Sequence, residues 1–260
     1  MKKKYSLFLL LIVFLYSPLW SIGQSYWEKP PNHFGIQYKP LIPINRVGDK
    51  PFSMKEGNFE TEIKPSFGYS YGAAVRIGIS ELLAIETGMN YIKRRYTAEY
   101  SVVDSNLVAS DRVGYVSFEI PVNLLVYVQL GKTIYMNVSG GVSTNFNPSN
   151  IRSVVIPDPY RLDLFIFEGK RLHYFDFNAN AEIGFEYRTE EAGIFYLGGY
   201  AKIPFTPILA IATEYRHDTK KQVAYEGITG ATFGLSLKYF FKNSKNKRSD
   251  SQRIKGPIEQ

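Results

Sequence analysis

Phe67-Gly-Tyr-Ser-Tyr-Gly-Ala-Ala-Val-Arg-Ile-Gly-Ile79 is the stretch that decides the fold. Every odd position in it is apolar or aromatic, whereas the even positions hold Gly, Ser, Ala and a single Arg. Successive side chains of a β-strand point to opposite faces. The stretch therefore predicts a strand with one bulky apolar face and one small or polar face.

The same alternation recurs along the chain and predicts eight strands. We expect them over residues 34–42, 67–79, 83–95, 116–128, 133–146, 173–187, 194–205 and 231–241. Several are longer than the roughly 9–11 residues that a tilted membrane strand needs. Beyond residue 24, no segment is apolar for the roughly 20 residues of a membrane helix.

The connections between these strands alternate in length. Short turns are expected near residues 80–82, 131–132 and 189–193, and long loops over residues 45–64, 101–112, 147–171 and 206–228. Short turns at one end and long loops at the other are typical of outer-membrane barrels. The sequence thus predicts an all-β fold, an eight-stranded antiparallel up-and-down transmembrane β-barrel, in the outer membrane with both termini periplasmic.

Alternation alone does not exclude a soluble, lipocalin-like barrel, which would face its apolar side chains toward a ligand cavity. Side-chain size favours the membrane barrel, because an eight-stranded interior is just wide enough to be filled by side chains. Aromatic residues near strand ends also fit the girdles at the two membrane boundaries. They are Tyr69, Tyr71, Tyr91, Tyr96, Tyr115, Phe118, Phe185, Tyr187, Tyr239 and Phe241.

The two ends of the chain have compositions of their own. Residues 1–24 combine three lysines after Met1 with an apolar run, the pattern of a secretory signal peptide. Residues 242–260 are rich in Lys, Arg, Ser, Asn and Gln and predict a basic, disordered periplasmic tail. The net charge of +7 lies in these two ends. The barrel of residues 25–241 is therefore neutral, which argues against nucleic acid as a partner.

The inward face is expected to carry charges of both signs. They are Arg76, Glu86, Glu119, Asp176, Glu182, Glu186, Arg188, Lys202 and Lys238. Buried charges persist when they are paired and hydrogen-bonded. The favoured interpretation is a set of salt bridges that stiffens the lumen, and the alternative is a proton or ion pathway.

No residue pattern demands a reaction. The chain has no cysteine, which excludes disulfides and thiolate metal sites. His173 would need a serine from a neighbouring strand to act as a catalytic base, and His217-Asp218 with Glu214 lacks a defined metal-ligand spacing. Gly140-Gly141 and Gly198-Gly199 lie in predicted strands, which favours close packing over phosphate binding. We expect no catalytic residue, no metal site and no cofactor, and thus no enzyme.

Four stretches resemble a known family, and the Glu119-Ile-Pro121 step is the most distinctive part of them. They are residues 35–43, 69–78, 83–91 and 118–122. They resemble the PorT/OmpX-like outer membrane β-barrel domain proteins of Bacteroidota. This resemblance implies an outer-membrane barrel, and some members of that family serve the type IX secretion and gliding apparatus. The tail after Phe241 departs from barrels that end at their last aromatic residue.

Two hypotheses of function follow, from different classes. In the first, the protein is a structural or interaction barrel of the cell envelope, an accessory of a secretion or envelope machinery. Membrane lipid and lipopolysaccharide would surround it, and the long extracellular loops or the basic tail would bind an envelope protein. In the second, it is a lipid-modifying enzyme or a small-solute transporter. The missing catalytic pattern favours the first. The apolar loop at residues 154–167 indicates either a partner surface or a hairpin above the membrane.

Overall fold

The computed structural model describes residues 32–41, 51–80, 82–158, 160, 162–189, 191–217 and 220–242. Regular structure in these ranges is β, apart from one 3-10 turn, η1 (Val103–Ser105). The strands are β1 (His33–Leu41), β2 (Phe52–Glu56), β3 (Phe59–Gly78), β4 (Leu83–Val102), β5 (Leu107–Gln129), β6 (Ile134–Phe146), β7 (Ile151–Val155), β8 (Asp163–Arg171), β9 (Phe175–Thr189), β10 (Gly193–Pro204), β11 (Leu209–His217), β12 (Lys220–Ile228) and β13 (Thr232–Phe240). In the part of the chain that is described, no helix is long and apolar enough to cross a membrane.

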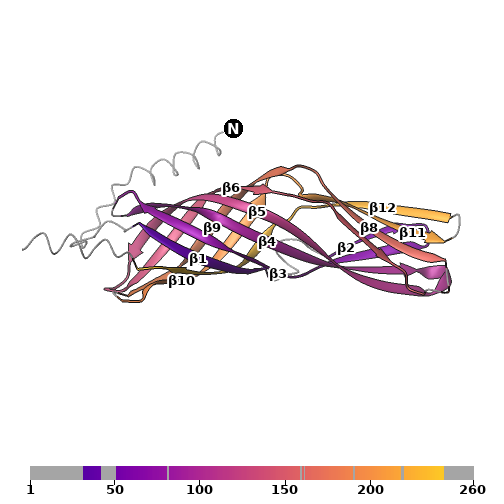
Figure 1. Cartoon of the computed structure of the whole chain (residues 1–260), viewed down its shortest axis with the longest axis horizontal. Helices are drawn as coiled ribbons and strands as arrows, with labels where there is room; N and C mark the ends of the chain where they lie inside the picture. The colour runs from indigo at the N-terminus through magenta and orange to yellow at the C-terminus, as the bar shows by residue number, and fades with distance from the viewer. Residues whose placement is uncertain are drawn as a thin grey trace, which may run out of the picture.

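Eight antiparallel strands close into a ring, which confirms the predicted barrel. Their order is β1-β3-β4-β5-β6-β9-β10-β13, and β1 closes the ring because it pairs with both β3 and β13. At one rim the backbone N–H of Phe241 donates to the carbonyl of Phe34 over 2.9 Å. The short β3–β4, β5–β6 and β9–β10 turns lie at this same rim, so we call it the turn rim (Figure 1).

The two faces of the ring strands differ as predicted. On β5, Ile120 and Val122 are 54% and 51% exposed, whereas the alternating Glu119 and Asn123 are buried. Of the two glycine pairs, Gly141 and Gly198 pack closely, as expected, whereas a Cβ on Gly140 or Gly199 would meet nothing closer than 3.9 Å. A Cβ on Gly141 of β6, for example, would lie 2.1 Å from the carbonyl oxygen of Val122 on β5. The apolar phase is therefore the outer face of the ring.

Where they are described, the four long links consist largely of strands, so their prediction as loops was wrong. β2 pairs with an extension of β3, and β7, β8, β11 and β12 form a second sheet in the order β12-β11-β8-β7. β12 lies against β2, and β7 lies against β5. These strands and the extended ends of β3, β4 and β5 make an upper barrel, at the end opposite the turn rim (Figure 1). The hairpin interpretation of residues 154–167 is confirmed, since β7 pairs with β8.

The upper barrel has its apolar side chains inside, the reverse of the ring below it. Phe59, Tyr100 and Phe165 come from β3, β4 and β8, and each is at most 1% exposed. The rings of Tyr100 and Phe165 stack with centroids 4.9 Å apart and planes at 7°. Where the outside of a structure meets water, the hydrophobic effect drives its apolar groups inward.

β3 changes its inward phase between the two barrels. Phe59 and Ile63 are buried in its upper part, whereas Ser70 and Arg76 are buried in its lower part. The register against β4 shifts between Ser66 and Tyr69. One extra residue at a β-bulge moves every later side chain to the opposite face. The bulge lets one strand serve an apolar core above and a polar lumen below.

Tyr96 and Tyr115 correct the predicted aromatic girdle. They are 3% and 1% exposed and point into the upper core, because they lie beyond the level at which the inside becomes apolar. Tyr69, Tyr71, Tyr91 and Phe118 do form an outer cluster, with neighbouring ring centroids 5.1–6.3 Å apart. The predicted signal peptide, residues 1–24, lies outside the described residues, as does the predicted tail apart from Lys242.

Candidate functional site: a charged lumen below an apolar core

Arg76 of β3 lies in the lumen near the turn rim, in register with His33, and is 1% exposed. Its Nη2 lies 2.8 Å from Glu86 Oε2 on β4, and its Nη1 pairs with Glu186 on β9. Its guanidinium lies over the ring of Phe240 at 4.1 Å. A buried guanidinium has five N–H donors and needs carboxylates on more than one side. Arg76 thus ties three strands together across the lumen.

Lys238 of β13, two strands from β3 around the ring, extends this network to Glu182 of β9. Its Nζ lies 2.5 Å from Glu86 Oε1 and 2.9 Å from Glu182 Oε1. Lys39 of β1 reaches Glu182 Oε2 at 3.1 Å. Each carboxylate therefore faces more than one cation, which offsets the cost of removing it from water.

A second layer of pairs lies nearer the upper barrel. Lys202 Nζ of β10 lies 2.5 Å from Glu119 Oε1 of β5. Asn90 Nδ2 donates to the other carboxylate oxygen over 3.1 Å, and Gln37 Nε2 donates to Asn90 Oδ1 over 2.6 Å. Side chains from four strands thus meet in this layer, and they leave the lumen occupied by paired groups.

The inward placement of the predicted charges is confirmed. Arg188 is partly exposed, and the other predicted charges are buried. Sequence reasoning missed Lys39 and Arg94, although each shares the inward phase of its strand with a polar residue, Gln37 in β1 and Asn90 in β4. Arg94 is 5% exposed and donates from Nη2 to the carbonyl of Gly230 over 3.1 Å, at the level where the polar lumen meets the apolar core.

The histidines lie apart from this network. His217 at the end of β11 has Nδ1 2.8 Å from Asp163 Oδ1, and the Tyr215 hydroxyl donates to the same oxygen over 2.8 Å. Asp218, part of the weighed metal site, lies outside the described residues. His173 is exposed just before β9, and its carbonyl accepts from Asn147 Nδ2 over 3.3 Å. Across the described residues, no three His, Cys, Asp or Glu side chains are grouped to hold a metal ion.

Tyr100 and Glu214 of the upper barrel have shifted pKa values. Burial in the apolar core raises the pKa of Tyr100. Glu214 of β11 is held between Arg216 and Lys221. Burial opposes ionisation of Glu214, but hydrogen bonds from these two cations outweigh it and lower the pKa of Glu214. Glu214 is therefore engaged in surface ion pairs rather than held as a proton donor.

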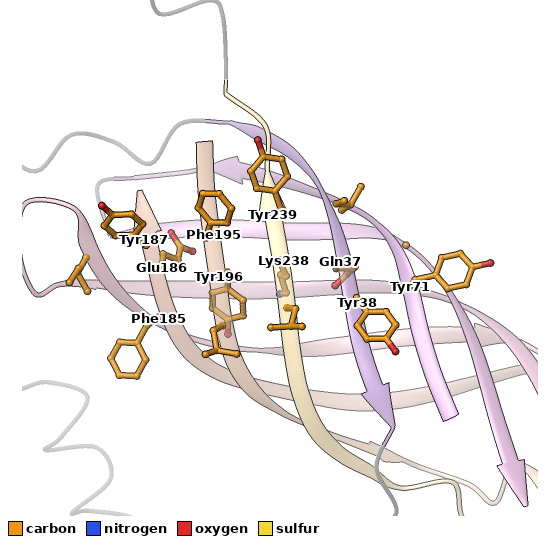
Figure 2. Close-up of a pocket in the computed structure, with 15 residues that line it drawn as sticks. Gln37, Tyr38, Tyr71, Phe185, Glu186, Tyr187, Phe195, Tyr196, Lys238 and Tyr239 are labelled. Carbon is orange, nitrogen blue, oxygen red and sulfur yellow. The ribbon is translucent and has the colours of Figure 1, made fainter. Parts of the chain in front are cut away.

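The outer face of β1, β9, β10 and β13 carries a groove of about 910 Å³ near the turn rim (Figure 2). Tyr38, Phe185, Tyr187 and Phe195 line it and are 41–54% exposed. A gap between outward aromatic rings on an apolar surface suits hydrocarbon chains better than a polar substrate. The groove therefore belongs to the outer apolar face of the ring rather than to the lumen.

A family model described as "Outer membrane protein beta-barrel domain" matches residues 32–210, which run from the start of β1 into β11. The chain belongs to this family. It is thus an outer membrane β-barrel protein, and the outer face of its ring is the lipid-facing one. No curated protein matches the chain significantly.

Two solved structures of outer membrane proteins are similar to this barrel. OprG from Pseudomonas aeruginosa is 10% identical with a TM-score of 0.47, over 83% of this chain and 98% of that one. The protease OmpT from Escherichia coli is also 10% identical, with a TM-score of 0.35, over 85% of this chain and 100% of that one.

Proposed function

We propose that the protein is a closed structural barrel whose upper barrel binds another component of the cell envelope. The filled lumen carries the proposal. Paired charges around Arg76 and Glu119 occupy the ring, and an apolar core follows above them. A transported solute would have to break buried ion pairs and then cross that core. The outer surface of the upper barrel is the part left to act on partners.

The orientation proposed is periplasmic for both termini. The described ends of the barrel and its short turns share the turn rim. Outer-membrane barrels place their short turns in the periplasm and their longer loops outside the cell. In this orientation the upper barrel projects from the cell surface.

The tip of the β7–β8 hairpin is the proposed contact surface for an extracellular partner. Ile156, Tyr160 and Leu162 are 60%, 97% and 73% exposed there. A partner that covers these apolar side chains removes them from water, which is favourable. Exposed apolar patches of this kind tend to mark partner surfaces. The basic tail, residues 242–260, is a second proposed contact, on the periplasmic side.

We also propose that the chain is a Bacteroidota PorT/OmpX-like member of its family, an accessory of a secretion or envelope machinery. The residues that support this are the strand containing Glu119-Ile-Pro121 and the sequence stretch 35–43. Truncation after Phe241 tests the tail. The barrel should still assemble, and one periplasmic association should be lost.

Photo-cross-linking in intact cells tests the contact surface. A photoreactive residue at Ile156 should yield one defined adduct, whereas the same residue at the 74% exposed Tyr225 of β12 should not. With the photoreactive residue kept at position 156, the adduct should disappear when Tyr160→Ser and Leu162→Ser are added in a variant that still folds. Cells that yield the same products at both positions would contradict the proposal. An altered lipid A mass profile in a deletion strain would instead favour the lipid-modifying enzyme.

A further inference from the structure

Three cations lie on the outer face of β4 and β5, on the upper-barrel side of the outer aromatic cluster. Lys93 pairs in register with Val116, Arg95 with Gly114, and Thr97 with Arg112. Arg95 and Arg112 are exposed, and Lys93 is half-buried. Their positions surround Gly114, with Arg95 directly across from it and Arg112 two residues along β5.

Gly114 makes a notch between these cations. It is exposed, and a Cβ built on it would meet Lys93 Cε at 3.5 Å and the carbonyl of Arg94 at 3.9 Å, with nothing closer. The Lys93 side chain therefore lies beside the notch. A small anion seated over Gly114 would have a positive group on more than one side.

These cations carry no ion pair within the described residues, which distinguishes them from their neighbour. Lys64 of β3 is held by Glu62 at 3.0 Å and Glu99 at 2.7 Å. Arg95 lies instead over the ring of Tyr69, 5.4 Å from its centroid. The outward Glu99 of β4 is thus engaged by Lys64, and no ion pair among the described residues compensates the charge around Gly114.

The surface below the notch is graded in polarity. Tyr69, Tyr91 and Phe118 form an aromatic layer, and the exposed Met89 and Ile120 continue it toward the middle of the membrane. The surface thus presents cations first, then aromatic rings, then an apolar wall. This order matches an amphiphile that carries a phosphate at the base of its head group. In the orientation proposed above, this amphiphile belongs to the outer leaflet.

We propose that Lys93, Arg95 and Arg112 form a binding site for the phosphate groups of an outer-leaflet glycolipid, the lipid A part of lipopolysaccharide. The site rests on the proposed orientation of the barrel, but it needs no protein partner. Arginine forks bind phosphate oxygens bidentately, and the lysine supplies a point charge. The acyl chains then lie along the aromatic and apolar surface below.

The test measures binding of lipid A to the whole protein folded in detergent, by native mass spectrometry. Each cation near the surface contributes about fivefold to binding. The Lys93→Gln/Arg95→Gln/Arg112→Gln variant should therefore bind on the order of 100-fold more weakly. A variant with the same loss of charge elsewhere, Lys55→Gln/Lys132→Gln/Lys170→Gln, should bind as the wild type does. Dephosphorylated lipid A should bind the wild type as weakly as lipid A binds the first variant.

A second variant keeps all three cations. Gly114→Glu places a carboxylate in the notch, where a Cβ has room, and should weaken lipid A binding comparably. Undiminished binding by this variant or by the first triple variant would overturn the site. Equal loss in the control triple variant would also overturn it, as would displacement of lipid A by millimolar inorganic phosphate. If lipid A fails to bind while the Ile156 adduct still forms, only the lipid A site is contradicted. If the adduct is lost while lipid A still binds, only the proposed function is contradicted.

Discussion

Single buried charges in the lumen depend on their partners. Lys202 and Glu119 form the simplest such pair, since the other hydrogen bond of that carboxylate comes from the neutral Asn90. Removing one member of a buried pair leaves a charge without compensation, which costs far more than removing both.

Lys202→Met should therefore lower the free energy of unfolding by about 3–5 kcal/mol. Adding Glu119→Gln should restore part of that loss, because the remaining side chain is neutral. Urea unfolding of the barrel in lipid vesicles measures both variants. Strictly additive losses would show that the two side chains do not interact.

Glycines on the two faces of the ring should respond differently to a large side chain. A Cβ on the inward Gly72 would lie 2.0 Å from the carbonyl oxygen of Met89, whereas one on the outward Gly140 would meet nothing closer than 3.9 Å. Gly72→Leu should cost about 1–3 kcal/mol through overpacking. Gly140→Leu is the matched control and should fold as the wild type does. The same unfolding assay would contradict this picture if both variants were equally stable.

At the scale of elements, β5 is informative because it runs through both barrels without changing phase. Its outward Val122 lies on the lipid-facing surface and its outward Val108 lies on the upper barrel, 51% and 70% exposed. The same side chain type thus faces hydrocarbon at one place and water at the other.

Val122→Arg should destabilise the barrel by about 2–4 kcal/mol, because a charge would face lipid near the middle of the membrane. Val108→Arg should change the stability by less than about 0.5 kcal/mol, as an exposed surface substitution does. Folding yields into vesicles and urea midpoints compare the two. A harmless Val122→Arg would mean that the apolar phase of the ring does not face lipid.

At the scale of the whole molecule, two barrels of opposite polarity share β3, β4 and β5. The ring has a polar interior and an apolar exterior, and the upper barrel has the reverse. Each has its own source of stability, paired charges with lipid contact below and an apolar core above. The aromatic cluster around Phe165 belongs to the upper one alone.

Phe165→Ala should therefore loosen the upper barrel by about 3–5 kcal/mol, the usual cost of emptying a buried phenylalanine site. Protease should then cut residues of β7, β8 or β11, while the ring keeps the heat-dependent gel migration expected of a closed barrel. Loss of heat-dependent migration in the variant would indicate that the two barrels unfold as one unit.

Wild-type protein should show no steady conductance in planar bilayers, since its lumen is filled.

The sequence by itself determined the ring. Alternation over residues 67–79 and its repeats set which side chains face lipid, because a strand has a period of two and one buried face fixes its phase. It also indicated the inward charges, from Arg76 to Lys238, since polar groups in that phase have nowhere else to point.

Only the tertiary structure decided which charges pair and where the environment changes. Arg76 meets Glu186 across 110 positions of sequence, and no local pattern encodes that contact. Tyr96 and Tyr115 are tyrosines near predicted strand ends, just as the girdle residues are, yet they face an apolar core. The physical reason is that alternation states only that two faces differ. Whether the apolar face meets lipid outside or a core inside depends on whether that level of the barrel lies in the membrane or in water.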